Sequence, residues 1–255
     1  MTNTGFIGKV YHRFDQLAST NDYAAELLAK SKPPEGTVVQ AASQSAGRGQ
    51  YGSHWHSAPG QNLTLSVIFY PSWLPIDAQF RLNEAVALAV FDTLDSLAGR
   101  PQTAPLHIKW PNDIWLGPLK TAGILLQNSL KGRSLDSTIA GIGLNVNQLE
   151  FPPEAPRAIS LAQEWGHTFD LDALAHQLFA CLESRYLQLK SGQTDALRAD
   201  YHQRLLGWKT TRSFRRPDGS VFSGEIQGVA EDGQLMVQTA RGTEMFGLKE
   251  IQFLT

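Results

Sequence analysis

A glycine-rich segment, GRGQYGSHW at residues 47–55, has the residue types of a loop that binds phosphate. Glycines let backbone N–H groups approach an anion closely, and Arg48 adds positive charge. The glycines also match the G-x-G-x-x-G spacing of dinucleotide-binding turns, which open a helix. Residues 53–62 cannot start a helix well, because Ser, Pro, Gly and Asn interrupt them without an apolar 3.6-residue period. We therefore expect strands at 36–44 and 63–69 around the loop, and no Rossmann unit.

A second pattern occupies IAGIGLNVN at residues 139–147. Side chains alternate between the faces of a strand, so the apolar residues predict a core face opposite a face of glycines and asparagines. That second face suits a ligand lying against the backbone, although a solvent-facing strand with a bend fits equally. The core face holds Ala140, Ile142, Leu144 and Val146, and the other holds Gly141, Gly143, Asn145 and Asn147.

Three more segments place polar side chains at the ends of predicted elements. KWPNDIW at 109–115 ends a strand at its proline and then offers Asn112 and Asp113, which suit a turn, a nucleotide site or hydrated Mg²⁺. Lys120 opens the next strand, where it is either solvated or paired with an anion. Ser-Thr-Asn at 19–21 has the composition of a helix cap. If these residues face a pocket, they would instead bind a neutral polar group such as a urea.

The bulk properties limit the class of protein. The 255 residues are 42% hydrophobic, enough for one large and one small domain. A net charge of −2 gives no bulk signal for nucleic acid binding. The single cysteine, Cys181, excludes an intramolecular disulfide. The N-terminus has no signal-peptide pattern and no apolar run reaches membrane-spanning length, so we expect a soluble, cytoplasmic protein.

The elements that would position these residues predict an α+β fold. Helices are expected at 19–30, capped by Ser19 or Thr20, and at 78–99, closed by Gly99. Further helices are expected near 158–165 and 171–190. Strands are expected at 106–110, 121–130 and 136–147, with a turn at Lys131-Gly132. From about Gly207 the pattern changes to short strands and turns, which predicts a small barrel.

Taken together, these motifs resemble those of the biotin–protein ligase family, and the resemblance extends over about residues 7–255. They occur in the order of that family and near its spacing: STN, QSAGRGQYGSHW, KWPNDI, KTAGILLQ and GIGLNVN. The resemblance implies a class II aminoacyl-tRNA synthetase-like catalytic domain over 1–200, with a mixed sheet and helices. It implies a small SH3-like β-barrel over 201–255. It also implies the ligase-only form, without the DNA-binding domain of some members.

The implied activity is ATP-dependent biotin–protein ligation. Biotin attacks the α-phosphate of MgATP, giving biotinyl-5′-AMP and pyrophosphate, and a lysine of a biotin carboxyl carrier domain then attacks the mixed anhydride. The implied cofactors are ATP and Mg²⁺. The implied partners are biotin, ATP and the carrier domain of a biotin-dependent carboxylase, with no nucleic acid or membrane, in a monomer or homodimer. Alternatives are a lipoate–protein ligase or octanoyltransferase, which would need a long apolar tunnel, and a non-catalytic biotin-sensing module.

The resemblance also assigns site residues by motif position. Lys120 and Arg48 are the implied catalytic residues, because two anions meet in the first step and positive charge offsets their repulsion. Asp113 is the implied Mg²⁺ ligand. The implied biotin contacts are Ser19, Thr20, Asn21, Gln44, Arg48, Gly49, Gln50, Lys120 and Gly123. The implied ATP or adenylate contacts are Arg48, Gln50, Trp55, Asn112, Lys120 and Asn145, with the 151–160 segment.

One position departs from the family pattern. Many relatives have arginine in the glycine loop where this chain has Gln50. The amide of Gln50 donates hydrogen bonds but carries no charge. We therefore expect the adenylate to be held less tightly than in a relative with GRGR at this place.

Overall fold

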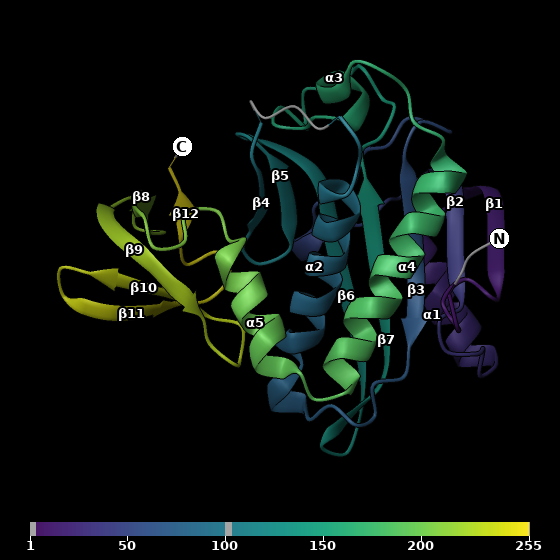
Figure 1. The fold of residues 1–255 in the computed structure, drawn as a ribbon, viewed down its shortest axis with the longest axis horizontal. Helices are drawn as coiled ribbons and strands as arrows, with labels where there is room; N and C mark the ends of the chain where they lie inside the picture. The colour runs from purple at the N-terminus through teal and green to yellow at the C-terminus, as the bar shows by residue number, and fades with distance from the viewer. Residues whose placement is uncertain (1–3, 100–103, 255) are drawn as a thin grey trace.

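The structure, a computed structural model, describes residues 4–99 and 104–254 and contains two β-sheets (Figure 1). The larger sheet has seven strands in the order β1-β2-β3-β7-β6-β5-β4, and among these described strands only β1 and β2 pair in parallel. The predicted α+β class is confirmed. The strands are β1 (Tyr11–Leu17), β2 (Val38–Gln44), β3 (Leu63–Phe69), β4 (Leu106–Lys109), β5 (Asp113–Leu116), β6 (Leu119–Lys131) and β7 (Ser134–Leu144).

Helices cover both faces of this sheet. On one face, α1 (Thr20–Lys30) packs Ala24 against Val39, Ile68 and Ile139. On the other, α2 (Phe80–Asp95) and α4 (Leu171–Lys190) lie side by side over the larger core (Figure 1). Both layers bury apolar side chains, which explains why every residue of β3 is buried.

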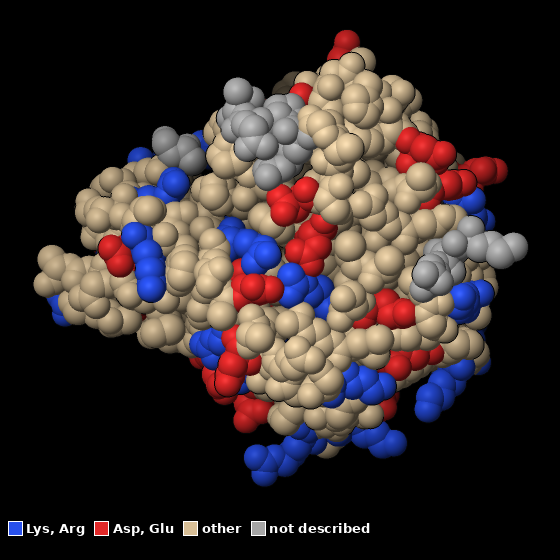
Figure 2. All heavy atoms as spheres, in the orientation of Figure 1, with Lys and Arg blue, Asp and Glu red and all other residues tan. Residues whose placement is uncertain are grey.

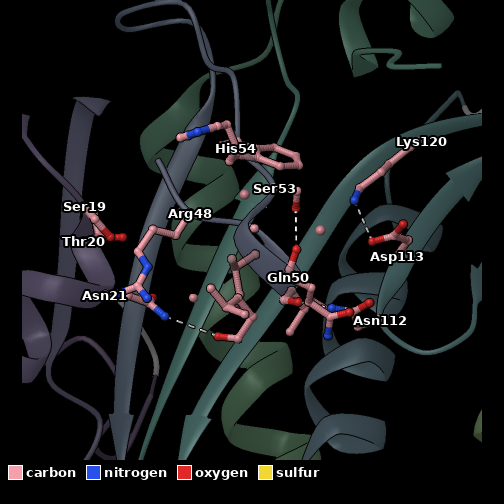
Figure 3. Close-up of a pocket in the computed structure, with 18 of the residues that line it drawn as sticks. Ser19, Thr20, Asn21, Arg48, Gln50, Ser53, His54, Asn112, Asp113 and Lys120 are labelled. Atoms are coloured by element: carbon pink, nitrogen blue, oxygen red, sulfur yellow. Dashed lines mark hydrogen bonds and ion pairs between the residues drawn. The ribbon is translucent and has the colours of Figure 1, made fainter. Parts of the chain in front are cut away.

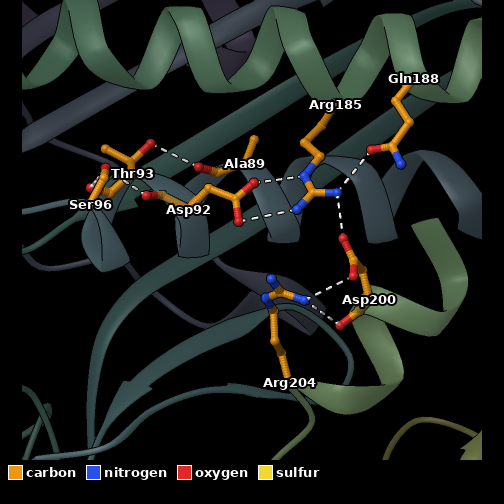
Figure 4. Close-up of polar contacts among 8 residues, drawn as sticks. All are labelled: Ala89, Asp92, Thr93, Ser96, Arg185, Gln188, Asp200 and Arg204. Atoms are coloured by element: carbon orange, nitrogen blue, oxygen red, sulfur yellow. Dashed lines mark hydrogen bonds and ion pairs between the residues drawn. The ribbon is translucent and has the colours of Figure 1, made fainter. Parts of the chain in front are cut away.

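One arginine ties three helices together. The Nε of Arg185 in α4 lies 2.6 Å from Oδ2 of Asp92 in α2, and its Nη1 lies 2.8 Å from Oδ2 of Asp200 in α5 (Thr194–Gln203) (Figure 4). The Arg185 side chain is only 13% exposed, so two carboxylates compensate its buried charge. On the molecular face that carries these helices, acidic and basic side chains are interspersed (Figure 2).

The second sheet is antiparallel, with the order β11-β10-β9-β8-β12. It packs against the rest of the chain, because Nε1 of Trp110 donates to the carbonyl of Gly233 at 3.0 Å and the N–H of Val229 donates to Nε2 of His202 at 3.0 Å. The division into two domains at residue 200 stays a prediction. The strands are β8 (Thr211–Arg215), β9 (Val221–Val229), β10 (Leu235–Thr239), β11 (Gly242–Phe246) and β12 (Gln252–Phe253).

Several predicted boundaries need correction. The helix expected to close at Gly99 ends at Asp95, with Ser96 as its C-cap: the backbone N–H of Ser96 donates to the carbonyls of Asp92 and Leu94, and Gly99 lies in the turns that follow. The strand expected to reach Asn147 ends with β7 at Leu144. The helix α5 was not predicted, because it is mostly polar: of its ten residues, only Leu197 and Tyr201 are buried. The helix expected near 158–165 is the short α3 (Leu161–Trp165). Within residues 4–99 and 104–254, no helix combines the length and apolarity needed to cross a membrane.

Candidate active site

The glycine-rich loop folds as a narrow hairpin rather than as a helix entry. The N–H of Trp55 donates to the carbonyl of Gly47 at 3.0 Å, and the N–H of Gly49 donates to the carbonyl of Ser53 at 2.7 Å. A Cβ at Gly47 would lie 2.5 Å from the carbonyl oxygen of Trp55, and one at Gly49 would collide with the hydroxyl of Ser53. Glycine is therefore needed at both places for the two arms to approach. The predicted strands on either side are present as β2 and β3, which confirms that the unit is not Rossmann-like.

This loop closes over a cavity of about 250 Å³ that lies against β6 and β7 (Figure 3). Every residue assigned to biotin lines the cavity, so residues up to 104 positions apart in the chain come together as expected. Of the residues assigned only to the nucleotide, Trp55 and Asn112 line this cavity too, and Asn145 does not. The biotin set is Ser19, Thr20, Asn21, Gln44, Arg48, Gly49, Gln50, Lys120 and Gly123.

One end of the cavity is a network of uncharged hydrogen-bonding groups. The side-chain oxygen of Gln44 accepts from the N–H of Thr20 at 2.8 Å, which joins β2 to the start of α1. The hydroxyl of Ser66 lies 2.6 Å from Oδ1 of Asn21 and 2.8 Å from Oγ1 of Thr20. Sequence analysis missed Ser66, although its place between Leu65 and Val67 puts it on the side of β3 opposite the main core. Fixed amides and hydroxyls of this kind suit a neutral polar group.

Two glycines of β7 make room for side chains of this cavity. A Cβ at Gly141 would collide with the amide of Asn21, and a Cβ at Gly143 would collide with the indole of Trp55. The core face opposite them is buried as predicted. Gly141 and Gly143 line the cavity as the glycine face predicted, but the face is not bare, because Asn21 and Trp55 lie against part of it. Asn147 is also a correction, since its amide exchanges hydrogen bonds with the backbone of Phe169 and it does not line this cavity.

The other end of the cavity is charged. Nζ of Lys120 lies 2.7 Å from Oδ1 of Asp113 and 5.7 Å from the ring centroid of Trp55. The backbone of Lys120 is held by the 155–160 segment: its N–H donates to the carbonyl of Arg157 at 2.7 Å, and its carbonyl accepts from the N–H of Ile159 at 2.9 Å. This ladder fixes the direction in which Lys120 leaves the strand and brings the 151–160 segment to the site.

A second cavity, of about 320 Å³, adjoins the first and shares Trp55 and Lys120 with it. Its lining includes Trp115, Phe151 and Arg157, so it is more aromatic than the first. Asn145 lines this cavity: its Nδ2 donates to the carbonyl of Ile159 at 3.2 Å, while its Oδ1 is buried without a partner among the described residues. A buried amide oxygen without a partner is costly, so Asn145 is a candidate to accept a hydrogen bond from a ligand.

The side chains of Arg48 and Asn112 both have partners within the protein, which the sequence did not predict. The guanidinium of Arg48 pairs with Asp22 in the first turn of α1, where both side chains are about half exposed. The amide of Asn112 donates to the carbonyl of Ile124, which fastens the 109–113 segment to β6. Both residues line the first cavity, but each already has a partner there.

The metal assignment rests on one carboxylate. Among the described residues, no group of three or more His, Cys, Asp or Glu side chains could enclose a metal ion. Of the described residues, Asp113 is the only acidic one that lines the first cavity. Mg²⁺ is commonly held by one or two carboxylates together with substrate phosphates, and Asp113 fits that arrangement rather than a site made by protein alone.

The comparisons with known proteins agree on one family. A family model described as the biotin/lipoate A/B protein ligase family matches residues 13–145. The bifunctional ligase/repressor BirA of Bacillus subtilis is 33% identical over 246 residues, which cover 95% of this chain and 73% of that protein. The biotin–[acetyl-CoA-carboxylase] ligase of Mycobacterium tuberculosis is 30% identical over 97% of this chain and 91% of its own length. A biotin protein ligase of Aquifex aeolicus, solved with biotin and ATP, shares the fold with a TM-score of 0.78 at 23% identity, covering 96% of this chain and 99% of that one.

Proposed function

This chain belongs to the biotin/lipoate A/B protein ligase family, and we propose that it is an ATP-dependent biotin–protein ligase with the reaction centre at Lys120. One observation carries the placement of the site: Lys120 lies where an elongated cavity with an uncharged hydrogen-bonding end meets a second, aromatic cavity. Biotin has a neutral ureido ring at one end and a carboxylate at the other. The two cavities thus suit biotin and the nucleotide, with their anionic ends at Lys120.

In the proposed first step, the uncharged network orients the substrate. The ureido ring binds at Thr20, Asn21 and Gln44, and the chain runs under Trp55 toward β6. The carboxylate then lies beside Lys120, where it attacks the α-phosphate of ATP and displaces pyrophosphate. Lys120 offsets the repulsion between the two anions and keeps its proton throughout, so the rate comes from positioning and electrostatics without a covalent enzyme intermediate.

In the proposed second step, the enzyme protects a mixed anhydride that water would hydrolyse. The glycine loop carries Arg48 and Gln50 over the first cavity, and its closure keeps water from the adenylate. The neutral amine of the carrier lysine attacks the biotinyl carbonyl carbon, and AMP leaves with the electron pair of the broken C–O bond. The nucleophilic nitrogen loses one proton to solvent as the amide forms.

The proposed metal ion enters with the nucleotide. Bound Mg²⁺ would neutralise phosphate charge and help pyrophosphate to leave. Asp113 is the residue of this chain that would hold it, and it also keeps Lys120 directed into the junction of the two cavities.

The biotin substrate is favoured over a lipoyl or octanoyl group by the chemistry of the first cavity. A lipoyl or octanoyl chain needs an apolar tunnel, whereas this cavity ends at amides and hydroxyls. The second cavity, with the unpartnered Oδ1 of Asn145, favours an enzyme that uses a nucleotide over a module that only senses biotin.

The finer description of the fold is also part of the proposal. The seven-stranded sheet with its helices corresponds to a class II aminoacyl-tRNA synthetase-like catalytic domain over residues 1–200. The five-stranded sheet corresponds to an SH3-like domain over 201–255. The proposed protein substrate is the carrier domain of a biotin-dependent carboxylase, and the oligomeric state is a monomer or a homodimer.

Incubation with biotin, MgATP and a purified biotin carboxyl carrier domain tests the function. Mass spectrometry should show one biotinyl group added to one carrier lysine, and only when both biotin and ATP are present. Addition of lipoate or octanoate in place of biotin should give no transfer. Transfer of lipoate but not biotin would overturn the proposed substrate.

A further inference from the structure

Lys109, the last residue of β4, was not assigned a role by the sequence motifs, and its surroundings are unusual for a lysine. Its ammonium lies 4.7 Å from the ring centroid of Trp115 in β5 and 5.5 Å from that of Phe253 in β12. The two rings come from different sheets, so the second sheet contributes one side of this aromatic cradle. Cation–π contacts of this kind hold an ammonium group weakly, while a stronger anionic partner can still bind it.

Positive charge exceeds negative charge around Lys109. Burial lowers the pKa of Lys109; nearby Asp113 raises this pKa, whereas Lys120 and Arg157 lower it further. Oδ1 of Asp113 already forms an ion pair with Nζ of Lys120, at 2.7 Å. Among the described residues, no carboxylate forms an ion pair with Lys109 or Arg157. Three cations, Lys109, Lys120 and Arg157, therefore gather near Asp113, and Glu154 is a second carboxylate on the lining of the second cavity. Positive charge still exceeds negative charge, an arrangement that favours a ligand with more than one negative charge.

The position of Lys109 indicates which part of a ligand it would meet. Lys109 lines the first cavity, Trp115 and Arg157 line the second, and Lys120 lines both. Given the proposed function, the carboxylate of biotin and the α-phosphate meet at Lys120. The β- and γ-phosphates must then lie to one side of that point, near the remaining cations.

We propose that Lys109 binds the β- and γ-phosphates of ATP and the pyrophosphate that leaves, and that Phe253 and Trp115 position its ammonium for this contact. The inference rests on the proposed function and deepens it. As the carboxylate oxygen bonds to the α-phosphorus, the bond from that phosphorus to the bridging oxygen breaks, and pyrophosphate leaves with the electron pair. Lys109 stabilises the charge that develops on pyrophosphate and transfers no proton.

Phe253 acts through Lys109 and is therefore a positioning residue. It is 8% exposed and packs edge-on against Phe214 at a centroid distance of 5.3 Å, while β12 pairs with β8. The ring is thus fixed by the second sheet before any ligand binds. When phosphates approach, their negative charge compensates the hydration that the partly buried ammonium of Lys109 has lost.

The first arm of the test compares Lys109→Met with Lys109→Arg in the full chain. Biotin-dependent exchange of labelled pyrophosphate into ATP gives the KM values for MgATP and pyrophosphate, and calorimetry gives biotin affinity. For Lys109→Met we expect both KM values to rise between about 10- and 100-fold, the effect of losing one charge-assisted hydrogen bond. Biotin affinity should change by less than about 3-fold, and Lys109→Arg should recover most of the loss, since arginine also binds phosphate.

The second arm tests the contribution of the second sheet. Phe253→Leu should raise the KM for pyrophosphate by about 2- to 5-fold, the size expected for the loss of one weak cation–π contact. The control is Phe222→Leu: this ring also packs on Phe214 but, in the described contacts, does not lie against Lys109. Its kinetic constants should stay within about 2-fold of the unmodified protein.

The outcomes separate this inference from the proposed function. If the unmodified protein lacks biotin-dependent exchange, the proposed function is wrong. If it exchanges normally and Lys109→Met retains its KM values for MgATP and pyrophosphate, the role of Lys109 is wrong and the function stands. If Phe253→Leu and Phe222→Leu behave alike, the positioning role of Phe253 is wrong.

Discussion

Replacing Lys120 by alanine removes the cation from the junction of the two cavities. The side chain points into this junction because its Nζ forms an ion pair with Oδ1 of Asp113 at 2.7 Å. The backbone of Lys120 is also held by hydrogen bonds with the backbone of Arg157 and Ile159. Substitution leaves both backbone hydrogen bonds in place, so we expect the fold to persist. The carboxylate of Asp113 then loses its partner and adds its own repulsion toward the two reacting anions.

The size of the effect follows from charge and distance. Two unit charges about 4 Å apart interact by about 4 kcal/mol at an effective dielectric constant of about 20. Each 1.4 kcal/mol, approximately, is a factor of ten in rate. The Lys120 side chain is 33% exposed, so water and salt screen part of this interaction. We therefore expect the rate of adenylate formation to fall on the order of 10²-fold or more.

Biotin-dependent pyrophosphate exchange measures this step, with Lys30→Ala as the matched control. Lys30 also pairs with a carboxylate, Glu26 at 3.4 Å, but the pair lies on the exposed side of α1 and its loss should leave exchange unchanged. Near-normal exchange by Lys120→Ala would refute the role given to Lys120. The double variant Lys120→Ala with Asp113→Asn separates two roles of Asp113. If the exchange rate partly recovers, the unpaired charge of Asp113 had slowed the single variant. If the exchange rate falls further, Asp113 acts as a metal ligand.

Three other substitutions should have distinct signatures. Asn145→Leu should weaken ATP binding and leave biotin binding intact, because only the second cavity loses a hydrogen-bonding group; calorimetry with each ligand tests this, and a loss confined to biotin would contradict it. Gln50→Arg should slow dissociation of preformed biotinyl-5′-AMP in a stopped-flow chase, since a charged donor replaces an amide; an unchanged rate would show that position 50 does not face the adenylate. Glu84→Gln should raise the melting temperature at pH 8 but not at pH 4. Burial raises the pKa of Glu84 to about 7, so the folded state resists an ionisation that the unfolded chain undergoes near its ordinary 4.5. The unmodified protein therefore loses stability between those values, by up to about 3 kcal/mol, and equal melting-temperature shifts at both pH values would contradict this.

Much of the site could be predicted from short motifs, since each motif sits on one element and local rules place its side chains. Ser19 caps α1, and the alternation of β7 predicted the buried Ala140 and Ile142. Contacts between distant elements could not be predicted in this way. Ser66 is one serine in an apolar strand, and only the crossing of α1 over β3 brings it to Asn21.

The same reason explains the corrected expectations. A glycine face on a strand indicates close approach, but the sequence does not say whether a ligand or a side chain approaches. Here the indole of Trp55 lies over Gly143. Likewise, Lys109 and Phe253 are 144 positions apart, and nothing local in either segment indicates that they meet.

A crystal structure with a hydrolysis-resistant analogue of biotinyl-5′-AMP tests the account most directly. The account predicts the ureido ring within hydrogen-bond distance of Thr20, Asn21 and Gln44. It predicts the phosphate mimic about 3 Å from Nζ of Lys120 and the adenosine in the cavity lined by Asn145. An analogue bound with its ureido ring beside Asn145, or with its phosphate mimic remote from Lys120, would contradict the central claim.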